Sequence, residues 1–269
     1  MAGLLQFIID NYNEVLKDIR RNAVVDTWFL MPSPGPIICI VGTYLIFVLK
    51  IGPKLMEKRP PFQLNTVIIL YNAFQVLFSV WLIHLILKID IKHVFFAHGF
   101  GDQNHSTSPK DINKEIVMLR AAWWYFFAKV IELLDTVFFV LRKKQNQITF
   151  LHVYHHTIMA FFTWCYLKFL PGEQGVIIGL FNSMVHVIMY SYYLIAALGP
   201  KYKKYLWWKR YMTSIQLMQF GIILIYLTLT LIMDCRTPKG LTYFFTIIGV
   251  TFMYLFSSFY RQTYKKKTA

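Results

Sequence analysis

Seven long apolar segments follow one another along this 269-residue chain, and they dominate what it can fold into. Most of them approach the roughly 20 residues that an α-helix needs to cross a bilayer. Hydrophobic residues make up 57% of the sequence, which is more than an ordinary water-soluble domain carries. In lipid a helix satisfies its own backbone hydrogen bonds, so the pattern indicates an all-α polytopic membrane protein. The predicted transmembrane helices cover residues 34–49, 66–87, 116–141, 148–169, 175–198, 212–233 and 241–260.

The two ends of the chain differ in character. From Leu4 onward, residues 1–30 have the composition of an amphipathic interfacial helix with Trp28 and Phe29 as anchors. The first apolar stretch is not expected to be a secretory signal, because it is too short and no basic residues precede it. Residues 261–269 form a basic tail. We therefore expect one transmembrane domain that covers residues 1–269.

Basic residues collect on one set of span ends. The ends that follow the first, third, fifth and seventh spans carry 16 lysines and arginines, and the opposite ends carry 11 that are diluted by acidic residues. The positive-inside rule places the richer side, with the C-terminus, in the cytosol and the N-terminus in the lumen. A glycosylation sequon at Asn104 lies on the predicted lumenal side. Lys266 and Lys267 resemble a dilysine signal for retrieval to the endoplasmic reticulum, although a solvated basic tail has the same composition.

Four of the apolar segments also carry polar groups that lipid cannot satisfy. Each group recurs at helical spacing, and each lies roughly 10–22 Å in from the basic end of its span. We therefore predict a ring of helices around a long cavity that opens to the cytosol at a polar mouth and is apolar toward the lumen. Such a cavity suits a long acyl chain. The four motifs consist of Lys129, Glu132, Asp135 and Thr136; His152, His155 and His156; Asn182, His186, Met189, Tyr190 and Tyr193; and Thr213, Gln216 and Gln219.

The basic span ends would form a rim around this mouth. Anionic lipid alone explains such a rim in any protein that obeys the positive-inside rule. The functional alternative is a dock for a polyanionic soluble substrate. Arg142, Lys209 and Arg261 are then the first candidates to bind phosphate, because each ends a helix at the mouth.

In this order the four motifs resemble those of the fatty-acid elongase (ELO) family, the 3-ketoacyl-CoA synthases of the endoplasmic reticulum membrane. Residues 129–136 match K-x-x-E-x-x-D-T and residues 152–156 match H-x-x-H-H. Residues 182–193 match N-x-x-x-H-x-x-M-Y-x-Y-Y, and residues 213–216 match T-x-x-Q. The resemblance implies the first step of very-long-chain fatty acid synthesis. In that step an acyl-CoA condenses with malonyl-CoA to give 3-ketoacyl-CoA, CO₂ and CoA, without a cofactor.

The resemblance also implies partners and roles. The partners are the two CoA substrates, membrane lipid, and the reductases and dehydratase of the elongation cycle. The resemblance leaves undecided whether the protein forms a homodimer, and nucleic acid is not an expected partner. His155 is the implied acyl-accepting nucleophile, and His186 assists it. The implied catalytic set is completed by His152, His156, Glu132, Asp135 and Asn182, and the implied substrate-binding set by Lys129, Tyr190, Tyr193, Gln216 and Gln219, with no metal ligand.

Two other classes of protein share part of this pattern. A di-metal membrane desaturase or hydroxylase also uses H-x-x-H-H, but two metal ions need about eight histidines in three boxes. Of the eight histidines here, four lie toward the predicted lumenal side, namely His84, His93, His98 and His105. A seven-span transporter or receptor would also carry intramembrane charges, but the sequence has no internal repeat of the kind that transporters show.

Overall fold

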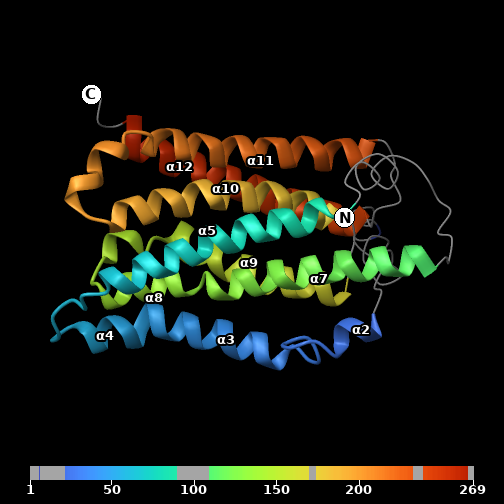
Figure 1. Cartoon of the computed structure of the whole chain (residues 1–269), viewed down its shortest axis with the longest axis horizontal. Helices are drawn as coiled ribbons and strands as arrows, with labels where there is room; N and C mark the ends of the chain where they lie inside the picture. Colours follow the sequence, from blue (N-terminus) through green and yellow to red (C-terminus); the bar gives the residue numbers. More distant parts are fainter. Residues whose placement is uncertain (1–5, 7–21, 90–108, 170–173, 233–238, 266–269) are drawn as a thin grey trace.

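The computed structural model describes residues 6, 22–89, 109–169, 174–232 and 239–265, and every regular element in these ranges is helical (Figure 1). The long helices run side by side along the longest axis of the molecule. The α-helices are α2 (Ala23–Asp26), α3 (Gly35–Ile46), α4 (Gly52–Met56), α5 (Asn65–Leu87), α7 (Pro109–Ile131), α8 (Leu134–Leu141), α9 (Phe150–Phe169), α10 (Gln174–Ala197), α11 (Lys209–Ile232) and α12 (Lys239–Tyr260).

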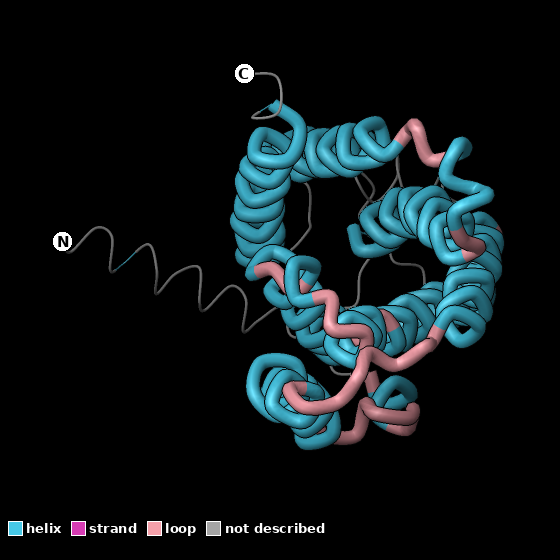
Figure 2. Tube along the Cα trace, turned by 90° about the vertical axis from the view of Figure 1, so that its left-hand side faces the viewer, coloured by secondary structure: helices cyan, strands magenta, loops and turns pink. Residues whose placement is uncertain are grey.

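Helices α5, α7, α9, α12, α11 and α10 contact one another in that order, and α10 closes the circle by packing on α5. Figure 2 looks along the helices and shows the ring that they form. Helices α3 and α4 lie outside this ring, at the bottom of Figure 1, where α3 packs on α9 and α4 on α8. Because the helices that these segments connect run antiparallel, residues 57–64, 142–149 and 198–208 lie at the left-hand end of the bundle in Figure 1.

Five helices in the described ranges are long and apolar enough to cross a membrane, which agrees with a polytopic membrane protein. They cover Gly35–Met56, Asn65–Leu87, Gly175–Ala197, Lys209–Ile232 and Thr242–Tyr264. The other two predicted spans, 116–141 and 148–169, are helical but less apolar, because they carry the charged residues and histidines of the first two motifs. Seven membrane crossings therefore remain a prediction.

The first predicted span is longer than its apolar run. The helix continues past residue 49 through a π-helical turn, Phe47–Ile51, and then through α4 to Met56. In this wider turn the Gly52 N–H bonds Phe47 O, five residues back, rather than the carbonyl four residues back. The next residue, Pro53, has no N–H to donate. A Cβ at Gly52 would lie 2.6 Å from Val140 Cγ1, so this glycine allows α4 to approach α8 closely.

The third predicted span is not one uniform helix, because α7 ends at Ile131 and α8 begins at Leu134. At this break the Leu133 N–H bonds Val130 O at 3.3 Å and the Asp135 N–H bonds Glu132 O at 3.1 Å, both three residues back. The side chains from Lys129 to Thr136 still meet in one site, but two helices joined by a tight turn carry them rather than one uninterrupted α-helix. The break lies inside the first motif and separates Lys129 from Asp135.

The N-terminal segment is anchored to α9 just before α3 begins. Most of the predicted helix over residues 4–30 lies outside the described residues, and from Asn22 onward only the short α2 is helical. The buried Lys168 side chain donates to Asp26 Oδ1 at 2.5 Å and to Met31 O at 2.7 Å. Trp164 Nε1 donates to Leu30 O at 2.7 Å. Asn104 and Lys266–Lys267 also lie outside the described residues.

Candidate active site

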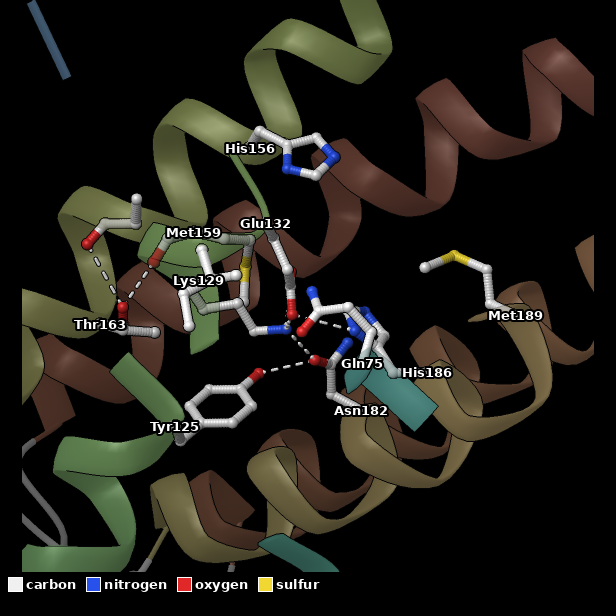
Figure 3. A network of polar contacts seen from close by, with 12 residues as sticks. Gln75, Tyr125, Lys129, Glu132, His156, Met159, Thr163, Asn182, His186 and Met189 are labelled. Atoms are coloured by element: carbon white, nitrogen blue, oxygen red, sulfur yellow. Dashed lines mark hydrogen bonds and ion pairs between the residues drawn. The ribbon is translucent and has the colours of Figure 1, made fainter. Parts of the chain in front are cut away.

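A buried polar network joins α7 to α10 (Figure 3). Lys129 Nζ donates to Glu132 Oε1 at 2.9 Å and to Asn182 Oδ1 at 2.7 Å. His186 Nδ1 lies 3.1 Å from the same Glu132 oxygen. All four side chains are buried. An ion pair is tolerated in such a place only when both charges have close partners, and here each of them does.

Asp135, beyond the helix break, makes a second set of contacts. The Tyr190 hydroxyl of α10 donates to Asp135 Oδ2 at 2.8 Å. His156 Nε2 of α9 lies 4.0 Å from the same oxygen. Tyr190 is fully buried, and its ring lies 5.5 Å from that of His186. Asp135 therefore links the first motif to the second and third.

His152 is held by hydroxyl groups. Its Nε2 lies 3.0 Å from Thr136 Oγ1, which in turn lies 2.8 Å from the Tyr44 hydroxyl of α3. The ring of His152 also lies against that of His156, with 4.3 Å between the ring centroids. Two histidines of the second motif are thus fixed on the side of α9 that faces α8.

His155 makes neither the hydrogen bond of His152 nor the carboxylate contact of His156. Its imidazole has no hydrogen-bond partner within the part of the chain that the structure describes. Its ring instead lies 5.1 Å from that of Phe252 and 6.2 Å from that of Phe256, both on α12. His155 also lines a cavity, whereas His152, His156 and His186 do not. Of the four motif histidines, it is the one whose imidazole lines the cavity.

This cavity lies inside the ring and is lined by residues from all six of its helices. Its polar lining near one end comes from His155, Asn182 and Gln219. From there it extends between apolar and aromatic side chains toward Tyr166 of α9 and Phe245 of α12. One polar end and a long apolar remainder are what a long acyl chain with a reactive head group requires.

The fourth motif, on α11, reaches the same region. Gln219 is buried and lines the cavity, and Thr213 is also buried. Gln216 Nε2 donates to Met189 Sδ of the third motif at 3.6 Å. The structure thus brings residues of all four motifs together.

Of the other predicted substrate-binding residues, Tyr193 lies at the edge of this network and three cations lie away from it. Tyr193 is exposed, and its ring is 6.0 Å from that of Tyr190. Arg142 ends α8, Lys209 begins α11 and Arg261 follows α12, and the last two are exposed. Among the described contacts, no hydrogen bond or ion pair joins these three cations to the buried network.

Two polar contributions to the site were missed from the sequence. The Tyr125 hydroxyl donates to Asn182 Oδ1 at 2.8 Å, and its ring lies 4.7 Å from Lys129 Nζ. Tyr125 precedes Lys129 by four residues, so it extends the stripe of the first motif by one helical turn. The second contribution comes from α5, whose buried Asn72, Gln75 and Ser79 share one face. Polar residues at spacings of three and four within an apolar run were the available signal.

No group of three or more His, Cys, Asp or Glu side chains in the described ranges is arranged to hold a metal ion. The histidines of the second motif point to different partners, since His152 meets Thr136, His156 meets Asp135 and His155 faces the cavity. The donor set that a di-metal desaturase needs is therefore not assembled by these residues.

Comparison with known proteins shows the family to which the chain belongs. Residues 29–269 match the GNS1/SUR4 (ELO) family. The chain is 43% identical to very long chain fatty acid elongase 7 of Drosophila melanogaster, in an alignment that covers 98% of this chain and 78% of that protein. It is 41% identical to very long chain fatty acid elongase 7 of Rattus norvegicus over 95% of its length (89% of that protein), and 42% identical to very long chain fatty acid elongase 4 of Homo sapiens over 90% (75% of that protein). The chain belongs to the ELO family.

Proposed function

We propose that this protein is a fatty acid elongase, an acyltransferase-type enzyme that condenses a long-chain acyl-CoA with malonyl-CoA to give 3-ketoacyl-CoA, CO₂ and CoA. The observation that carries the proposal is the place of His155, a side chain without a hydrogen-bond partner among the described residues at the polar end of a long apolar cavity. The names of the relatives, very long chain fatty acid elongases, support the same activity. They do not favour a desaturase.

In the first half of the proposed reaction, a neutral nitrogen of His155 attacks the carbonyl carbon of the acyl thioester. A C–N bond forms and the C–S bond breaks. CoA leaves as a thiolate and takes up the proton that the acylated ring loses from its other nitrogen. The products are an acyl-imidazole on His155 and free CoA, while the acyl chain occupies the apolar part of the cavity.

In the second half, malonyl-CoA loses CO₂, and the electrons of the broken C–C bond remain as an enolate on the thioester. The enolate carbon attacks the acyl carbon, the C–N bond breaks, and His155 regains a proton from water. Asn182 and Gln219 reach the same end of the cavity and are suited to hydrogen-bond the developing oxyanion. No cofactor is needed beyond the two CoA substrates.

The buried charges act through the histidines rather than on the substrate. Glu132 bonds His186 Nδ1 and fixes the orientation of that ring, much as a carboxylate orients the histidine of a hydrolase triad. Lys129 balances the Glu132 charge and holds Asn182 beside the cavity. Asp135, which accepts the Tyr190 hydroxyl, lies 4.0 Å from His156 Nε2, so it places a carboxylate beside that ring without a hydrogen bond to it. We assign Lys129, Glu132 and Asp135 as positioning residues.

The activity is tested by adding a long-chain acyl-CoA and labelled malonyl-CoA to membranes from cells that express the chain. Labelled 3-ketoacyl-CoA and CO₂ should form together, in excess over membranes that lack the protein. Mass spectrometry of the acyl products then gives the preferred chain length. A desaturase would instead yield a product of unchanged length that has lost two hydrogens.

We assign CoA binding to Arg142, Lys209 and Arg261, which follow or begin helices at the end of the bundle beside the polar end of the site. Replacing each by glutamine should raise the KM for both CoA substrates and change kcat little, because phosphate contacts act equally on ground state and transition state. Steady-state kinetics on the three single variants measure this effect. An unchanged KM in all three moves the CoA phosphates to another surface.

In the cell we place the protein in the endoplasmic reticulum membrane, with the N-terminus in the lumen and the C-terminal tail in the cytosol. The basic span ends and the dilysine-like Lys266–Lys267 support this orientation. The rim then faces the cytosol, where soluble CoA esters reach it. The proposed partners are the reductases and dehydratase that act on the 3-ketoacyl product, and a homodimer is compatible with the same orientation.

A further inference from the structure

We propose that the side chain of Tyr166, seated on Gly175, closes the apolar end of the cavity and sets the longest acyl chain that the enzyme accepts. The inference rests on the proposed function, because it takes His155 as the point where the acyl chain is attached. It adds a specificity-determining pair of residues on the far side of the cavity from the four motifs.

Tyr166 lies at the end of the face of α9 that lines the cavity. His155, Met159, Phe162, Thr163 and Tyr166 recur on this face at helical spacing. Eleven residues separate His155 from Tyr166, which corresponds to about 16 Å along the helix. Tyr166 is the last cavity-lining residue of α9. An extended chain attached to His155 and following this face therefore reaches the Tyr166 ring.

The ring of Tyr166 is held in place. Its hydroxyl accepts the Gly175 N–H at 3.1 Å. Gly175 lies in the first turn of α10, where backbone N–H groups have no acceptor within the helix. A Cβ at Gly175 would overlap the Tyr166 ring, so only glycine lets the ring sit there. The ring also contacts that of Phe245 at 5.8 Å and is buried in an apolar cluster with Val176 and Leu227.

The wall beside this end has a second glycine. Gly179 lines the cavity one turn beyond Gly175 and one turn before Asn182. A Cβ at Gly179 would meet its nearest atoms, on Ile86 and Tyr125, at 3.8 Å, which is ordinary van der Waals contact. The helix therefore tolerates a side chain here, and a larger one would occupy cavity space. Substitutions at Tyr166 and Gly179 should shift chain length in opposite directions.

The experiment uses the full-length protein in membranes, a series of saturated acyl-CoAs of increasing length, and malonyl-CoA. Tyr166→Leu should extend the longest product by at least one round of elongation. Gly179→Leu should favour the shorter acyl-CoAs. Each shift should change the ratio of long to short products roughly tenfold. One round of elongation adds two methylenes, and each buried methylene changes binding by about a factor of four. Tyr166→Phe keeps the ring and should leave the length limit where it is.

Gly42→Leu is the matched control, because Gly42 lies in α3 outside the ring and a Cβ there meets no atom within 4 Å. Unchanged product lengths in both Tyr166→Leu and Gly179→Leu, with elongation retained, would overturn the inference. If thermal unfolding shows that Tyr166→Leu does not fold, Gly179→Leu decides alone, since an unchanged length preference in that variant contradicts the proposal. A wild-type protein that makes no 3-ketoacyl-CoA at any length overturns the proposed function instead.

Discussion

Incubation of the purified protein with a long-chain acyl-CoA, in the absence of malonyl-CoA, should release free CoA and leave the acyl group on His155. The reason is that His155 is the motif histidine whose ring faces the cavity without a hydrogen-bond partner among the described residues. His152 and His156 lie instead against Thr136 and Asp135. A thiol assay measures the released CoA, and mass spectrometry of the peptide that contains residues 152–156 locates an adduct that hydroxylamine removes.

His155→Ala should abolish this adduct and lower the rate of elongation roughly a thousandfold or more, as expected when a covalent nucleophile is removed. His84→Ala is the matched control, because His84 is an exposed histidine of α5 that lines neither the network nor the cavity. If CoA appears only after malonyl-CoA is added, the covalent route is wrong. A ternary complex with the histidines as general bases then replaces it.

Replacing one member of the Lys129–Glu132 pair should strongly destabilise the protein. Lys129→Met leaves the buried Glu132 carboxylate without its cation, and Glu132→Gln leaves the Lys129 ammonium without the carboxylate that neutralises it. Each single substitution should cost about 3–5 kcal/mol, the usual result of leaving one buried charge unpaired. Thermal unfolding in detergent measures this cost. Lys143→Met removes a lysine whose single hydrogen bond among the described residues goes to Glu57 O, and it should cost about 1 kcal/mol or less.

The double variant Lys129→Met/Glu132→Gln separates the structural role of the pair from its role in catalysis. Removing both charges leaves no unpaired ion, so most of the lost stability should return. Elongation should nevertheless stay low, because the Glu132 carboxylate no longer fixes the His186 ring. If the destabilisation of the double variant equals the sum of the two single variants, the two charges are not coupled and this account of the network is wrong.

The class of fold and the residues of the four motifs follow from the sequence alone. Apolar runs of this length restrict the chain to membrane-crossing helices, since no other backbone structure available to a single apolar run satisfies its hydrogen bonds in lipid. Polar residues inside such runs must face protein, and their similar depths indicated that they would meet. The contacts of Glu132 with His186, Asp135 with Tyr190 and His152 with Thr136 are consistent with this reasoning.

Only the tertiary structure decided which partner each side chain has. Helical spacing gives the face on which a residue lies, but it does not give the helix that packs there. The free ring of His155 and the contribution of Tyr125 could therefore not be read from the motifs. The break at Glu132–Leu133 also left no trace in the apolar pattern, because both turn residues fit a continuous helix. The end of the cavity at Tyr166 depends on Gly175 of the next helix, a contact that exists only once the ring of helices has closed.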